Sequence, residues 1–83
     1  MRTFQSETGQ WWVAGAREEE TPRHHGRWYM ILHPQDDEAA VLVLPEIRWQ
    51  TRASAERTLE TMSLFELRRR LEIAQRRASA TRA

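Results

Sequence analysis

The chain has 83 residues and a formal net charge of +1, from 13 basic and 12 acidic side chains. A chain of this length forms one domain, which buries only about 60% of the surface that the unfolded chain exposes. The absence of cysteine excludes disulfides and zinc–thiolate centres as sources of stability. We therefore predict one domain over residues 1–83 that gains stability from a second subunit or another partner.

Residues 1–7 contain no apolar stretch like that of a signal peptide, and the longest apolar run, 39–44, is far too short to cross a bilayer. These features indicate a cytoplasmic protein with no membrane partner. The charge is spread unevenly, because residues 1–51 hold five Arg against eight acidic residues, whereas residues 52–83 hold eight Arg against four. The sequence thus predicts a polarised surface with a basic C-terminal side.

Three segments have the aromatic, β-branched or alternating apolar residues that are typical of strands: residues 10–16, 27–33 and 39–44. A charged loop separates the first two segments, and a turn-rich loop precedes the third. Pro45 ends the third strand or sits at a bulge, so residues 46–50 either resume that strand or form a fourth. We predict a β-meander over residues 10–50, preceded by an N-terminal extension at 1–9.

Residues 51–78 have the periodicity of helices. Ser63 and Glu66 form a capping box, and Met62 is placed to pack on Leu67 just inside the helix. The inward stripe of this helix is predicted to contain Leu64, Leu67, Leu71, Ala74 and Ala78. We therefore predict a helix from about residue 64 to residue 78, followed by a frayed tail at 79–83.

Thr51 or Ser54 is placed to cap an earlier helical segment, so the C-terminal part is either one kinked helix or two. The predicted fold class is α+β, an antiparallel three- or four-stranded meander followed by one or two C-terminal α-helices packed on one sheet face. The second and third predicted strands are apolar on both faces. The face without helices therefore needs another cover, from the terminal segments, a second subunit or a ligand.

Residues that carry chemistry do not form a catalytic pattern. The three histidines, His24, His25 and His33, lack the spacing that places two metal ligands on one face of a strand or helix. No serine lies in a nucleophile elbow, and the isolated glycines exclude a glycine-rich phosphate loop. We expect no catalytic residue, no metal and no cofactor, and hence a protein that is not an enzyme.

Aromatic residues exceed what one small core can hold. The chain has four tryptophans, and neighbouring aromatics such as Trp11 and Trp12 point to opposite faces of a strand. Trp and Tyr are enriched at subunit interfaces, and two further apolar residues lie outside the inward stripe of the C-terminal helix. We predict a protein-interaction or self-associating module, either a homodimer or the partner of another protein, with interface residues Trp12, Tyr29, Phe65 and Ile73.

An arginine-rich stretch supports an alternative prediction. Residues 63–83 hold six Arg and two Glu, a balance of +4. Solvated helix faces account for most such runs, but guanidinium groups also contact nucleic-acid phosphates. The alternative function is therefore nucleic-acid binding, DNA included, by this helix and the sheet aromatics. Its predicted contact residues are Arg68, Arg69, Arg70, Arg76 and Arg77.

Residues 28–62 resemble the arm-type DNA-binding module of tyrosine recombinases (phage integrases). The matching residues lie in a short turn and the helix after it: Trp49, Thr51, Ala55, Glu56 and Leu59. The resemblance implies a three-stranded sheet that enters a DNA groove. This chain departs from the family because its sheet loops are acidic at 18–20 and 36–38, and the match covers less than half of the chain. We assign no family on this basis.

Overall fold

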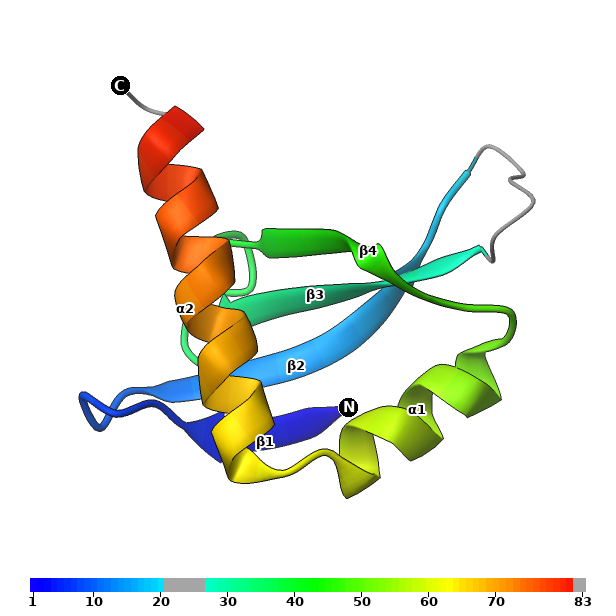
Figure 1. Cartoon of the computed structure of the whole chain (residues 1–83), viewed down its shortest axis with the longest axis horizontal. Helices are drawn as coiled ribbons and strands as arrows, with labels where there is room; N and C mark the ends of the chain where they lie inside the picture. Colours follow the sequence, from blue (N-terminus) through cyan, green and yellow to red (C-terminus); the bar gives the residue numbers. More distant parts are fainter. Residues whose placement is uncertain (21–26, 82–83) are drawn as a thin grey trace.

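A computed structural model describes residues 1–20 and 27–81 of the chain. Its elements are β1 (Arg2–Gln5), β2 (Trp11–Glu18), β3 (Trp28–Pro34), β4 (Leu42–Trp49), α1 (Arg52–Thr61) and α2 (Leu64–Thr81) (Figure 1). The four strands form one antiparallel sheet in the order β1-β2-β3-β4. The predicted α+β meander followed by C-terminal helices is confirmed.

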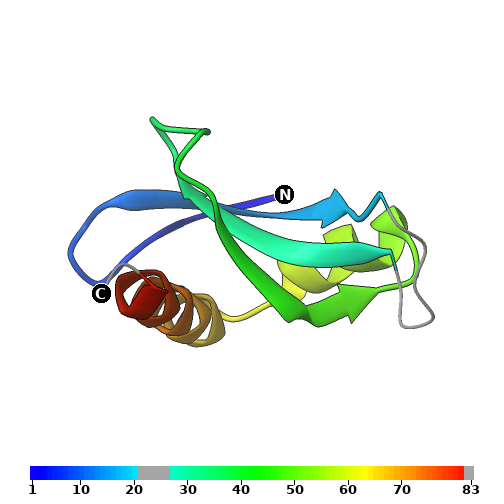
Figure 2. The same cartoon turned by 90° about the horizontal axis from the view of Figure 1, so that it is seen from above.

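Both helices lie against the same side of the sheet (Figure 2), and the core lies between the two layers. Alternate residues of the strands point to this side, so a single set of apolar side chains meets the helices. The core cluster contains Phe4, Trp12, Ala14, Met30, Leu32, Leu44, Leu59, Leu67, Leu71 and Ala74. No described helix is long and apolar enough to cross a membrane.

Strand β1 corrects the prediction that residues 1–9 form an extension. It pairs antiparallel with β2, and Phe4 lies opposite Trp12 and is buried in the core. A tight turn follows, in which the Gly9 amide donates to the Ser6 carbonyl at 3.0 Å and Gly9 has a φ of +92°. Periodicity did not reveal β1 because the strand has four residues and one large apolar side chain.

Strand β4 continues through Pro45, so residues 46–50 largely resume the third predicted strand. The register with β3 shifts at this point, because Leu44 lies opposite Met30 whereas Arg48 lies opposite Tyr29. Pro45 falls in the bulged segment between Leu44 and Arg48, on an edge strand that tolerates a missing amide donor. β4 begins at Leu42 instead of residue 39, because the preceding residues form turns around Asp37.

The helical part consists of two helices, each with a predicted cap. Thr51 Oγ1 accepts from the Ser54 amide at 3.1 Å, and Ser63 Oγ accepts from the Glu66 amide at 3.1 Å. In the predicted capping box the Glu66 carboxylate also accepts from the Ser63 amide. In the structure this carboxylate instead accepts from Arg70 at 2.9 Å. α2 continues to Thr81, beyond the predicted end at residue 78.

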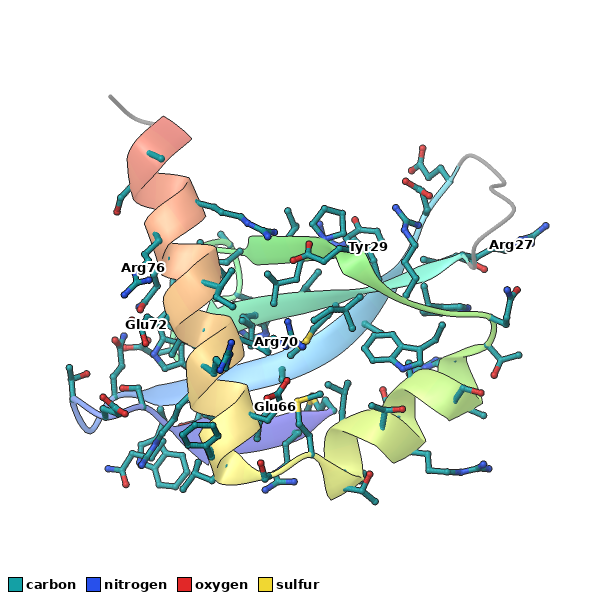
Figure 3. The ribbon with its side chains drawn as sticks, viewed as in Figure 1. Arg27, Tyr29, Glu66, Arg70, Glu72 and Arg76 are labelled. Atoms are coloured by element: carbon teal, nitrogen blue, oxygen red, sulfur yellow. The ribbon has the colours of Figure 1, made fainter. Side chains whose placement is uncertain are left out.

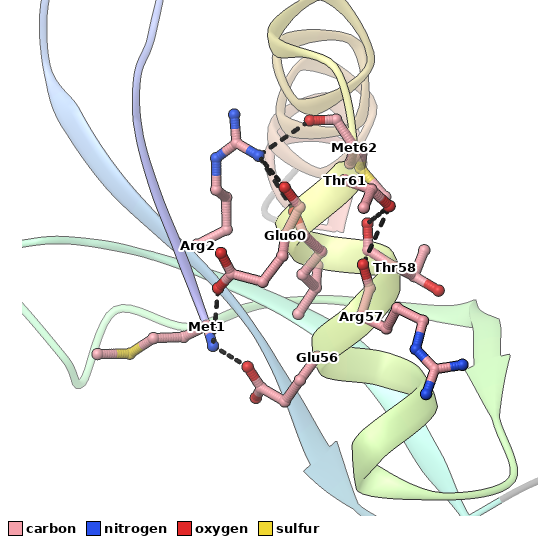
Figure 4. A network of polar contacts seen from close by, with 9 residues as sticks. Met1, Arg2, Glu56, Arg57, Thr58, Glu60, Thr61 and Met62 are labelled. Atoms are coloured by element: carbon pink, nitrogen blue, oxygen red, sulfur yellow. Dashed lines mark hydrogen bonds and ion pairs between the residues drawn. The ribbon is translucent and has the colours of Figure 1, made fainter.

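Arg2 links the first strand to the end of α1 (Figure 4). Its Nη1 donates to the carbonyls of Leu59, Glu60 and Met62 at 3.3, 2.9 and 3.1 Å. The last carbonyls of a helix have no intrahelical donor and carry the negative end of the helix dipole. A guanidinium at this position therefore satisfies several of them together and fixes β1 beneath the helical layer.

We expect Arg2→Gln to lower the free energy of unfolding by about 1–2 kcal/mol, because the variant loses charge-assisted hydrogen bonds to the helix end. Urea denaturation measures this loss. Arg57→Gln is the control, because it removes an exposed arginine from the same helix. Equal stability losses in the two variants would show that the contacts of Arg2 contribute nothing specific.

Candidate interaction surfaces

The four predicted interface residues lie in three different places. Trp12 is buried, at 5% exposure, in the core opposite Phe4, so its prediction as an interface residue is corrected. Its indole nitrogen is buried without a hydrogen-bond partner among the described residues. The adjacent Trp11 is the outward-facing one and is 49% exposed. Tyr29 lies on the sheet, and Phe65 and Ile73 lie on α2.

The side of the sheet away from the helices carries a continuous set of mostly apolar residues. Strand alternation and register place seven of them on this open face, Trp11, Val13, Gly15, Tyr29, Ile31, His33 and Val43, together with the polar Thr3, Gln5 and Arg17. Val43 pairs with Ile31 and is 44% exposed. The helices cover the opposite side (Figure 2), so large apolar side chains of the open face remain in contact with solvent.

One end of the open face is polar and ordered. The Arg48 guanidinium lies 5.8 Å from the centre of the Tyr29 ring, within the range of a cation–π contact. The same guanidinium donates to both carboxylate oxygens of Glu19, at 2.9 and 3.3 Å. These contacts link Glu19, Arg48 and Tyr29 at the border of the apolar residues.

A groove with a volume of about 460 Å³ runs along the outer side of α2. We name it the α2 groove. It is lined by Leu64, Phe65, Arg68, Arg69, Ile73 and Arg76, with Glu72 on the helix and Glu7 from the β1–β2 turn beside them. Phe65 is 75% exposed. Leu64 was predicted to point inwards, but it is 42% exposed because it lies at the edge of the buried stripe.

The structure brings the predicted pair Phe65 and Ile73 together in this groove, but it separates both from Tyr29 and Trp12. Ile73 is half-buried and also packs against the core cluster. Trp11, Val43 and Leu64 were missed as exposed apolar residues. Alternation could have shown that either Trp11 or Trp12 faces outwards, but both alternating sets of β2 are apolar, so the sequence held no signal for choosing between them.

Most of the five predicted nucleic-acid contact residues bind acceptors in the chain itself. The Nε of Arg68 donates to the Gln5 carbonyl at 3.0 Å, and Arg70, Arg76 and Arg77 pair with Glu66, Glu72 and Glu46. Figure 3 shows the Glu72–Arg76 pair on one flank of α2 and the Glu66–Arg70 pair on the other. Among the described residues, Arg69 forms no ion pair. The arginines therefore do not form a single unpaired stripe.

The contact between Arg77 and Glu46 makes stability depend on pH. Arg77 donates to the Glu46 carboxylate at 2.8 Å, and this hydrogen bond lowers the pKa of Glu46 below its ordinary value of 4.5. A carboxyl group with a depressed folded-state pKa stabilises the fold above the unfolded-state pKa. That stabilisation is lost as the pH falls through the lower, folded-state pKa.

We expect Arg77→Gln to have a slightly lower Tm than the wild type at neutral pH, because the pair is exposed and largely screened. This difference should shrink towards zero between about pH 5 and pH 3, as Glu46 becomes protonated in the wild type. Thermal melts across a pH series measure it. A difference of the same size at every pH would contradict the assignment to Glu46.

The described residues contain no group of three or more side chains suited to hold a metal ion. His33 directs its Nδ1 towards the Pro34 carbonyl at 2.7 Å, and His24 and His25 lie outside the described residues. The two exposed apolar surfaces, the open face and the α2 groove, are therefore the candidate sites. Comparison of the chain with protein-family models, curated proteins and solved structures finds no match.

Proposed function

We propose that this protein is a non-catalytic interaction module that forms a homodimer through the open face of its sheet. The observation that carries the proposal is the pair of large apolar side chains, Trp11 and Val43, exposed on the side of the sheet that the helices leave uncovered. Contiguous apolar patches on small proteins usually mark sites of association. The cysteine-free sequence suits a reducing compartment such as the cytoplasm.

The dimensions of the molecule support a second copy as the occupant. Its extents are 36 × 32 × 21 Å, so each broad side spans a rectangle of about 1,150 Å². A standard interface buries about 800 Å² per partner, about one-seventh of the 5789 Å² that this chain exposes. Face-to-face packing of two sheets is a common arrangement in proteins.

The chemistry of the open face also suits pairing with itself. In a twofold dimer each residue of the patch meets the same patch on the partner, so the centre must be free of unpaired charge. Gly15, Ile31 and Val43, which lie opposite one another across three strands, form such an uncharged centre. The charged Arg17 and Arg48 lie opposite Tyr29 at the border of the face, and Arg48 is paired with Glu19.

Nucleic-acid binding is less well supported. Four of its five predicted contact residues bind acceptors within the chain, and phosphates would have to compete with carboxylates that are already in place. The sheet that would present aromatic side chains to bases lies on the other side of the molecule from α2. Loops of acidic residues also border that sheet.

Sedimentation equilibrium of the wild type and three variants tests the proposal. We expect the wild type to sediment at twice its monomer mass of 9.9 kDa. Trp11→Glu and Val43→Glu should be monomers, because each places two carboxylates in the twofold interface. Phe65→Glu makes the same kind of change on the opposite side, so it should remain a dimer. A wild-type monomer at all concentrations would reject the proposal.

A further inference from the structure

The α2 groove has the composition of a binding surface that the proposed dimer does not use. The dimer would cover the open face of the sheet, whereas the outer side of α2 points away from the sheet (Figure 2). The groove therefore stays exposed in the monomer and in the dimer. Phe65 lines it with three-quarters of its surface in solvent, although burying a Phe side chain is worth about 1.5–3 kcal/mol.

The groove combines apolar anchors with positive charge. Leu64, Phe65 and Ile73 supply the apolar surface, and three guanidinium groups surround it against two carboxylates. Arg69 has no ion-pair partner among the described residues, and Arg68 uses only its Nε in the contact with Gln5. Guanidinium donors thus remain for carboxylates that a partner brings.

The shape of the site favours a helix as the occupant. The α2 groove follows α2 from Leu64 to Arg76, a stretch of helix about 20 Å long. A second helix packs on such a surface with its axis about 8–10 Å away, placing one apolar stripe between the two. Recognition of this kind uses apolar anchors one and two turns apart, and polar residues flank them.

We infer that the α2 groove binds an acidic amphipathic helix of another protein. Phe65 is the main anchor of the site, and Arg69 and the Nη groups of Arg68 pair with carboxylates that flank the apolar stripe of the ligand, while Arg76 stays paired with Glu72. A second copy of α2 is a poor occupant, because its own arginines would face these three. The proposal stands on the groove alone and does not depend on the dimer.

A protein ligand fits these residues better than a nucleic acid does. The exposed Phe65 and Leu64 gain nothing from a phosphate backbone, and an α-helix cannot present them to stacked bases as a sheet presents aromatics. Glu7 and Glu72 would also lie along any backbone that follows the arginines. A peptide can place its carboxylates singly, opposite the guanidinium groups.

Fluorescence anisotropy with a labelled helical peptide of about 16 residues tests the inference. The peptide carries Leu at helical positions i, i+4, i+7 and i+11 with Glu on both flanks, and a second peptide has Gln in place of Glu. We expect the Glu peptide to bind more tightly than the Gln peptide and to weaken as salt rises. Phe65→Ala should weaken binding at least about tenfold, and Arg69→Gln should weaken it severalfold.

Two control variants separate this site from the rest of the molecule. Arg57→Gln removes an exposed arginine outside the groove and should not change the affinity. Trp11→Glu should bind the peptide as the wild type does, so failure of the dimer and failure of the groove are distinguishable. Equal affinity of wild type and Phe65→Ala would overturn the inference. Tighter binding of a mixed-sequence oligonucleotide than of the Glu peptide would overturn it too, and would assign the groove to nucleic acid.

Discussion

Replacing Trp12 with Ala should lower the free energy of unfolding by about 3–5 kcal/mol, the largest loss expected from any change in the sheet. Trp12 is 5% exposed and belongs to the core cluster, where it lies opposite Phe4 of strand β1. Removal of the indole leaves a cavity that the short edge strand cannot refill. For a domain of this size, such a loss is a large fraction of total stability.

Trp11→Ala is the matched control, because it removes the same side chain one residue earlier in the same strand. Trp11 is half-exposed, so the monomer should lose less than about 1 kcal/mol. Denaturation by guanidinium, at a protein concentration low enough for the monomer to dominate, measures both variants. Equal losses would contradict the assignment of Trp12 to the core and Trp11 to the open face.

Leu67→Ala should cost about 2–5 kcal/mol, because Leu67 is completely buried where α2 packs on the sheet. Leu64→Ala removes the same side chain one turn earlier, where it lies in the α2 groove and is partly exposed. We expect that variant to lose less than about 1 kcal/mol. Urea midpoints of the two variants provide the comparison. A loss at residue 64 as large as that at residue 67 would show that α2 is rotated about its axis.

The helical part of the fold was predictable because its signals are local. Ser63 and Thr51 each bind an amide three residues ahead, so a pattern of four residues is enough to locate both helix starts. The inward positions of Leu67 and Leu71 follow from a spacing of three to four residues. The Glu66–Arg70 and Glu72–Arg76 pairs are local in the same way, because the two residues of each pair lie about one helical turn apart.

The arrangement of the sheet was only partly predictable because it depends on distant contacts. Strand β1 owes its structure to pairing with β2 and to the bonds from Arg2 to the end of α1, almost sixty residues away. The sequence predicted that the strands now seen as β3 and β4 are apolar on both faces. Which of Trp11 and Trp12 points inwards depends on where the helices pack, and no local pattern contains that information.

Both candidate surfaces were predicted in part. The helical wheel placed Phe65 and Ile73 outside the main stripe, which is where the α2 groove lies. The arginines were predicted as one contact set, but their partners come from several elements. Gln5 in β1 and Glu46 in β4 bind Arg68 and Arg77, and these contacts arise only because α2 crosses the sheet from its first strand to its last.

The most direct test of the proposed dimer is an isotope-filtered NOE measurement on a mixture of labelled and unlabelled chains. Only contacts between two copies give signals in this experiment. The proposed dimer predicts intermolecular NOEs among the Ile31 and Val43 methyl groups and the Trp11 indole. Intermolecular NOEs confined to α2, or none at any concentration, would contradict a dimer formed by the open face of the sheet.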